Sequence, residues 1–278
     1  MKRNDSLPKR ILIYAIILIF VAISVYPILR VFTISLRPGN TLLSDSLAII
    51  PDDATWNNYV VLFTQKPFLT WAWNSFLVTV AVMLTGVALA STAGYAFSRY
   101  NFPGRNTGLL SLLVTQMFPA TMLILPMFIL LAKLHLINKF TGLIIIYLST
   151  ALPFCVWQMK GFYDTIPVSL EEAARIDGLG RFASFYRVIL PLAAPALVIV
   201  ALFSFMTAWT EYIVAAQLLY YEELFTLPIG LKSFQSNMST EWGLYAASAL
   251  IVSIPAVILF LALTKYLIGG LTLGSVKG

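Results

Sequence analysis

Six uncharged runs decide what this chain can fold into, because each is long enough to cross a membrane. A transmembrane helix needs roughly 20 apolar residues to span about 30 Å of hydrocarbon. Backbone polar groups in lipid have to be satisfied within the segment, which favours helices. The chain is 59% hydrophobic and only 11% charged, against about 25% charged residues in soluble domains. We therefore predict an all-α, polytopic membrane protein with six transmembrane helices. The runs are Ile11–Leu29, Pro67–Ser98, Asn106–Ala132, Phe140–Met159, Val188–Thr210 and Trp242–Thr264.

The basic residues predict the orientation of these helices, because cytoplasmic loops carry an excess of Lys and Arg. With the N-terminus inside, twelve of the 18 basic residues fall in cytoplasmic segments and six fall outside. Both termini are thus expected in the cytoplasm, and the net charge of +6 reports topology rather than nucleic-acid binding. The first run is too long for a cleaved signal peptide and is expected to be a retained span.

Catalytic and metal chemistry lack candidate residues in this sequence. The chain has one cysteine, Cys155, and one histidine, His135, so neither a metal site nor a nucleophile–base pair can be assembled from them. No Gly-x4-Gly-Lys-Ser/Thr phosphate loop occurs. We expect a protein that is not an enzyme and holds no cofactor, so any energy for transport has to come from another chain.

One polar segment interrupts the apolar pattern between the fourth and fifth runs, on the predicted cytoplasmic side. Ser169 and Glu172 have the spacing of a capping box, which predicts a helix that begins at Ser169. Gly178 and Gly180 are suited to end that helix. A second helix is expected over 182–189, with Pro191 opening the fifth span.

Two interpretations of Glu172 stay open at this point. Its carboxylate either caps its own helix or pairs with a cation on a partner protein, beside the low ridge of Ala173 and Ala174.

The same segment resembles a known motif. Glu172-Ala173-Ala174, three residues, Gly178, nine residues, Val188, one residue and Leu190-Pro191 are similar to the cytoplasmic "EAA" loop of ATP-binding-cassette (ABC) importer permeases. GYAFSRYNFPGR (94–105), the tract 118–178, TLPIGL (226–231) and GLTLGSVKG (270–278) resemble the carbohydrate branch, most of all maltose/maltodextrin permeases. The chain departs from that branch at Leu179, where a small residue is usual, and at Thr210, where asparagine is usual.

The resemblance implies that this chain forms part of the transport path, while other chains supply the energy and deliver the substrate. The chain would have the ABC type I importer permease fold and translocate a sugar by alternating access in the cytoplasmic (inner) membrane. Its partners would be a second permease subunit, a homodimer of a separate ATPase that holds the ATP and Mg, and an extracytoplasmic sugar-binding protein. The implied segments are a cytoplasmic N-terminus at 1–10, the first helix at 11–32, an extracytoplasmic loop at 33–66, the permease domain at 67–268 with its coupling loop at about 161–190, and a cytoplasmic tail at 269–278.

The resemblance also implies four sets of site residues. The ATPase-docking set is Glu171, Glu172, Ala173, Ala174, Asp177 and Gly178. The tail set for a contact with the ATPase is Gly274, Ser275, Val276, Lys277 and Gly278. The translocation-path set is Trp209, Thr210, Glu211 and Tyr212, and the binding-protein set is Tyr221, Glu222, Phe234 and Gln235.

Two other functions are compatible with an apolar, multi-span chain. A proton-coupled carrier working alone would use Glu211, the one acid within an apolar stretch. Because Glu211 lies about 30 Å of helix beyond Pro191, it is expected near the outer interface, where it could be solvated or serve as a cap. A channel would need a ring of selectivity residues, which the spans do not show.

Overall fold

The computed structural model describes residues 7–39, 42, 48–235 and 239–273, and within them every regular element is helical. The longer helices are α1 (Leu7–Ser35), α3 (Phe68–Arg99), α4 (Arg105–Thr115), α5 (Ala120–Lys133), α6 (Phe140–Thr165), α10 (Ala194–Trp209) and α13 (Trp242–Leu273). The shorter elements are α2 (Asn57–Thr64), α7 (Ser169–Ile176), α8 (Arg181–Ser184), the π-helix η1 (Phe185–Ile189), α9 (Leu190–Leu192), α11 (Ile213–Leu218), the 3₁₀ helix η2 (Glu222–Leu224) and α12 (Leu227–Ser233).

Within the described residues, four helices are long and apolar enough to cross a membrane. They are Leu7–Ser35, Phe68–Arg99, Phe140–Thr165 and Trp242–Thr264. A fifth span is formed if Arg181–Leu192 and Ala194–Trp209 count as one segment, which is bent by 78°. The predicted all-α, multi-span fold is confirmed, and five of the six expected spans coincide with these helices when the bent pair is counted as one span.

The expected continuous span over 106–132 is wrong. It consists of α4 and α5, which have 11 and 14 residues and are separated at residues 116–119. Pro119 disfavours the helical conformation of the residue before it, and this breaks the apolar run into two helices.

The chain forms two compact units, residues 1–68 with 231–254 and residues 69–230 with 255–278. In the first unit, buried Asn58 donates to the backbone oxygens of Ser35 and Arg37, both at 2.9 Å. The start of α13 approaches the same side chain, since a Cβ on Gly243 would lie 2.5 Å from Nδ2 of Asn58. Asn58 thereby connects α1, α2 and α13.

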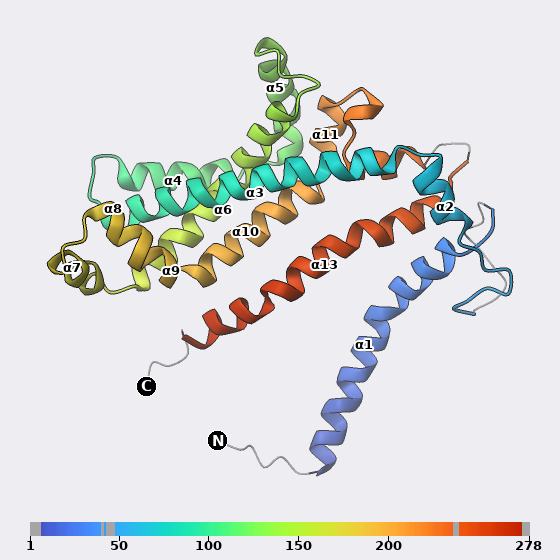
Figure 1. The fold of residues 1–278 in the computed structure, drawn as a ribbon, viewed down its shortest axis with the longest axis horizontal. Coiled ribbons are helices and arrows are strands. Elements are labelled where there is room, and N and C mark those ends of the chain that lie inside the picture. Colours follow the sequence, from blue (N-terminus) through green and yellow to red (C-terminus); the bar gives the residue numbers. More distant parts are fainter. Residues whose placement is uncertain (1–6, 40–41, 43–47, 236–238, 274–278) are drawn as a thin grey trace. The chain divides into compact units, whose positions relative to one another are not determined.

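The second unit is a layer of helices in which α3, α4, α6 and α10 run alongside one another (Figure 1). Membrane helices associate through close backbone approach at small residues, because lipid offers little hydrophobic driving force. The buried interface accordingly contains Ala90, Ala151, Ala193 and Ala196. Cys155 on α6 contacts Ser204 on α10, with 3.5 Å between Sγ and Oγ.

Gly94 marks a close approach of α3 to α6. A Cβ at this position would lie 2.6 Å from Cβ of Met159 and 3.0 Å from the backbone nitrogen of Lys160. Only glycine fits there, so α3 and α6 are held at a fixed separation at the end where the polar loop begins.

Substitution of Gly94 with alanine is therefore expected to separate α3 from α6. Overpacking of this kind costs about 1–3 kcal/mol, and the detergent-solubilised protein is predicted to unfold at a lower temperature. The matched control is Gly161→Ala on α6, where a Cβ meets nothing within 4 Å and helix propensity favours alanine. Equal thermal stability of the two variants would contradict the close-packing account.

Candidate functional site

The polar loop, defined here as residues 166–193, joins α6 to α10 and contains α7, α8, η1 and α9. It lies at the end of the second unit where α3 and α6 finish and α10 starts (Figure 1). The predicted order of helix, glycine turn and helix is confirmed, although its details differ from the sequence expectation.

The expected capping box of Ser169 and Glu172 is wrong. Val168 is the N-cap residue and forms no side-chain cap, and its backbone oxygen accepts from the amides of Glu171 and Glu172. Since Val168 already adopts helical angles, Ser169 is inside the helix rather than before it. No side chain caps the start of α7, so the capping interpretation of the Glu172 carboxylate is not borne out, and this side chain is exposed.

Gly178 ends α7 as predicted. Its φ of +88° is left-handed, a conformation that costs other residues about 1–2 kcal/mol. The amide of Leu179 then donates to the carbonyl of Ala174 at 3.0 Å. Gly180 has a φ of −69°, so the turn requires only one of the two glycines.

The second half of the polar loop is less regular than the single helix expected over 182–189. It consists of α8, η1 and α9, and the chain then bends by 78° at Ala193 before α10 begins. Neither helix of this bent segment begins at Pro191, the predicted start of the fifth span: Pro191 lies in α9, and α10 begins at Ala194 with Pro195 in its first turn.

The face of α7 that points outward carries part of the predicted docking set. Glu172, Ala173, Asp177 and Gly178 are exposed, whereas Glu171 and Ala174 are buried. The separation of three residues between Glu171 and Ala174 places both on one side of the helix. The carboxylate of Glu171 is thus directed into this chain.

Glu171 is bound by the last turn of α3. Its Oε1 accepts from Nε of Arg99 at 2.5 Å and its Oε2 accepts from the hydroxyl of Tyr95 at 2.6 Å. The side chain of Glu171 is 2% exposed and that of Arg99 is 9% exposed. Breaking a buried ion pair by removing one partner typically costs about 3–5 kcal/mol, so this contact fixes α7 firmly to α3.

Arg99 extends this contact to the end of α6. Its Nη2 donates to the carbonyl of Ile166 at 2.8 Å, and its neighbour Ser98 donates to Asp164 at 2.7 Å. Asp164 also pairs with Lys160 at 2.6 Å on the surface of α6. The ends of α3 and α6 and the start of α7 are consequently joined through one arginine.

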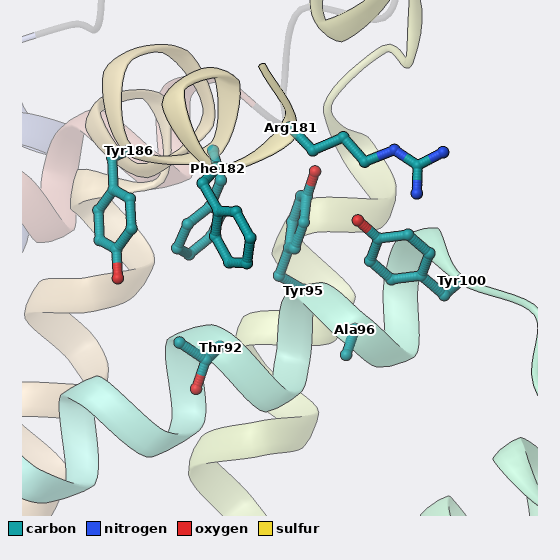
Figure 2. Close-up of a pocket in the computed structure, with 8 residues that line it drawn as sticks. Thr92, Tyr95, Ala96, Tyr100, Arg181, Phe182 and Tyr186 are labelled. Atoms are coloured by element: carbon teal, nitrogen blue, oxygen red, sulfur yellow. The ribbon is translucent and has the colours of Figure 1, made fainter.

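An open pocket of about 370 Å³ separates the end of α3 from the second half of the polar loop. Figure 2 shows Tyr95, on α3, and Tyr100, just after the end of α3, lining one side of this pocket, with Phe182 and Tyr186 of the polar loop on the other side and Arg181 at the rim. Phe182 is 82% exposed. Its exposed aromatic ring gives this side of the loop an apolar surface.

The predicted translocation-path residues are placed at the end of α10 and in the turn after it. Glu211 caps α11, because its carboxylate accepts from the amides of Val214 and Ala215 at 2.8 and 3.0 Å and from the hydroxyl of Tyr147 at 2.8 Å. Trp209 is buried against Phe205, Thr210 bonds the carbonyl of Met206, and Tyr212 is half-buried. Of the alternatives open for Glu211, the capping role is the one observed.

The four residues predicted to contact the binding protein belong to different compact units, two to each. Tyr221 and Glu222 are exposed in the second unit, where the indole of Trp71 donates to the carbonyl of Glu222 at 3.1 Å. In the first unit Phe234 is buried and Gln235 accepts from Lys232 at 2.6 Å. The tail set, Gly274 to Gly278, lies outside the described residues.

Sequence reasoning did not single out Tyr95 or Arg99 as site residues. Arg99 stands at the end of an apolar span, where a basic residue is common, so it was counted only toward topology. The available signal was its position in GYAFSRYNFPGR, within a few residues of two tyrosines. Among the described residues, no group of three His, Cys, Asp or Glu side chains could hold a metal ion.

Comparison with known proteins identifies the class of the chain. Residues 85–272, about two thirds of the sequence, match the model of a family described as "Binding-protein-dependent transport system inner membrane component". The chain belongs to this family. It is therefore a multi-pass permease of the ABC importer class, and the match supports this class over a carrier that works alone.

Relatives within this family match along nearly the whole length of the chain. The maltose/maltodextrin transport system permease protein MalG of Salmonella typhimurium is 36% identical over 281 residues, covering 94% of both chains. The maltodextrin transport system permease protein MalD of Streptococcus pneumoniae is 34% identical and covers 91% of this chain and 90% of its own. Among solved structures, a bacterial ABC transporter involved in the import of the acidic polysaccharide alginate matches with a TM-score of 0.81 and 26% identity, over 95% of this chain and 99% of that one.

Proposed function

We propose that the chain is the permease subunit of an importer for maltose, maltodextrins or related oligosaccharides, driven by a separate ATPase. The substrate class is supported by MalG and MalD, whose names give maltose and maltodextrin. The partners would be a second permease, an ATPase homodimer carrying ATP and Mg, and an extracytoplasmic binding protein, with both termini in the cytoplasm of a cell whose inner membrane holds the complex.

One observation carries the proposed coupling. The exposed face of α7 presents the carboxylate of Glu172 beside Ala173 and Gly178, while the opposite face is fixed to α3 through Glu171. A small, rigid, acidic surface of this kind suits a cleft that contains a cation. We assign docking on the ATPase to Glu172, Ala173, Asp177 and Gly178, and we leave Glu171 and Ala174 to packing within this chain.

ATP-driven uptake by the complete complex tests the function. The chain is reconstituted in vesicles with the second permease, ATPase and binding protein of its own genome, and entry of labelled maltose and of a short maltodextrin is measured. Uptake is expected only with ATP and with all four components. Uptake by this chain alone that stops when a protonophore is added would contradict the proposal and favour a proton-coupled carrier.

Loss of the charge on Glu172 tests the docking surface. Because a hydrogen bond to a charged group contributes about 1.5–3 kcal/mol, Glu172→Gln is expected to weaken ATPase binding by about tenfold or more. The measurement is titration of the ATPase against the permease pair in nanodiscs, with membrane insertion checked in parallel.

Asp53→Asn serves as the control for Glu172→Gln, since Asp53 is an exposed acid in another loop. The control is expected to bind the ATPase like the unaltered protein. Unchanged binding in Glu172→Gln would remove this carboxylate from the docking surface.

A further inference from the structure

The acidic pair at the start of α7 is divided between two environments. Glu172 is exposed, whereas Glu171 is 2% exposed and bound to Arg99 and Tyr95. Docking on a partner requires only outward-facing groups. Burial of a charge is costly unless it is paired and hydrogen-bonded, so the inward carboxylate needs a separate explanation.

The last turn of α3 holds both halves of the polar loop. Arg99 and Tyr95 bind Glu171 in the first half, and the ring of Tyr95 packs on Phe185 in the second half with 4.6 Å between ring centroids. Arg99 also holds the carbonyl of Ile166, just before α7. The contacts of α3 therefore reach the loop at three separate points.

The connection from the polar loop to α10 has irregular backbone, unlike the connection to α3. Residues 185–189 form a π-helix, and the chain bends by 78° at Ala193. Short π-helical segments and breaks in the backbone ladder are places where a helix can change direction. The loop is thus fixed on the α3 side and has irregular backbone on the α10 side.

We propose that Arg99 and Glu171 are positioning residues that couple α7 to α3. A displacement imposed on the polar loop would move the end of α3 with it, and η1 and Ala193 would absorb the change in angle toward α10. This inference rests on the proposed function, because it assigns the route by which work done by the ATPase reaches the membrane helices.

The chemistry of the pair suits this task. A carboxylate accepts simultaneously from Tyr95 on one oxygen and from Arg99 on the other, and bonds to ionised groups are shorter and stronger than neutral ones. Glutamine offers one acceptor oxygen in place of two. Glu171→Gln therefore removes the charge and leaves one acceptor oxygen where the carboxylate has two, while it preserves the size of the side chain.

The first experiment measures coupling in the reconstituted complex with maltose as the transported probe. The readouts are the amount of ATPase that co-purifies and the number of maltose molecules imported per ATP hydrolysed. For Glu171→Gln we expect co-purified ATPase within about twofold of the unaltered complex and a transport ratio lowered by about fivefold or more, in the range of allosteric couplings.

Asp164→Asn is the matched control for Glu171→Gln. Asp164 lies at the same end of the unit, but its side chain is 40% exposed in its pair with Lys160, and asparagine keeps an oxygen that can accept from Ser98. Exposed pairs contribute little, so its transport ratio is expected to stay unchanged. A transport ratio for Glu171→Gln equal to that of the control would overturn the proposal.

A second variant separates coupling from folding. Arg99→Cys with Glu171→Cys, in a background in which the one native cysteine is changed by Cys155→Ser, is bridged by a short bis-methanethiosulfonate reagent, which enters the space left by the two shorter side chains and forms a disulfide with each thiol. Without the bridge, the double-cysteine variant is expected to assemble with the ATPase but to import fewer maltose molecules per ATP hydrolysed than the unaltered complex. Bridging is expected to restore the ratio, and reductive cleavage of the bridge is expected to lower it again.

Each failure has a distinct meaning. If the unaltered complex imports no maltose with ATP, the proposed function fails. If that complex transports but bridging leaves the ratio of the double-cysteine variant unchanged, the coupling role fails. Failure of both the Glu171→Gln and double-cysteine variants to assemble with the ATPase also overturns the coupling role, because the pair would then be needed for folding.

Discussion

The buried ion pair between Arg99 and Glu171 is the contact on which the arrangement of the polar loop depends. It fixes which side of α7 faces the helical layer and therefore which residues face outward. Because Glu171 and Ala174 point inward, Glu172, Ala173 and Asp177 are left exposed. The same arginine holds the carbonyl of Ile166, so the orientation of the loop is set by bonds that a purely apolar contact would not provide.

Close packing beneath the loop gives this contact a rigid base. Gly94 allows α3 to lie against Met159 of α6, and small residues fill the interface with α10. Helix interfaces in a membrane are stabilised by close packing more than by the removal of apolar surface from water. A force applied to α7 would therefore meet a stiff connection to α3 and α6 and a bent connection to α10. This asymmetry supports the proposed coupling, in which the polar loop, α3 and α6 would move together as one rigid body.

The sequence predicted the membrane-spanning character because apolar runs of sufficient length have few other structures available. It also predicted the turn at Gly178, whose left-handed angle is confirmed. The prediction of one continuous span over 106–132 was wrong because the sequence stays uncharged through residues 116–119, where the helix breaks. The capping box failed because helix entry depends on the backbone angles of Val168, which no side-chain pattern specifies.

The inward role of Glu171 could not be read from the sequence. Two adjacent acids in a polar helix look equivalent until the facing surface is known, and that surface comes from Tyr95 and Arg99, more than 70 residues earlier. The motif in the loop pointed to Glu172 and Gly178 through resemblance to a family. The partner of Glu171 is a long-range contact, and only the packing of α3 against the loop reveals it.

The central claim is that α7 and the end of α3 move as one body, and pairwise distances between spin labels test it most directly. Labels replace exposed Leu170 on α7 together with either Leu89 on α3 or Phe203 on α10. The distances are recorded in the complex without nucleotide and with ATP bound. The account predicts that the distance from Leu170 to Leu89 stays constant while the distance from Leu170 to Phe203 changes. A change between positions 170 and 89 as large as that between 170 and 203 would contradict it.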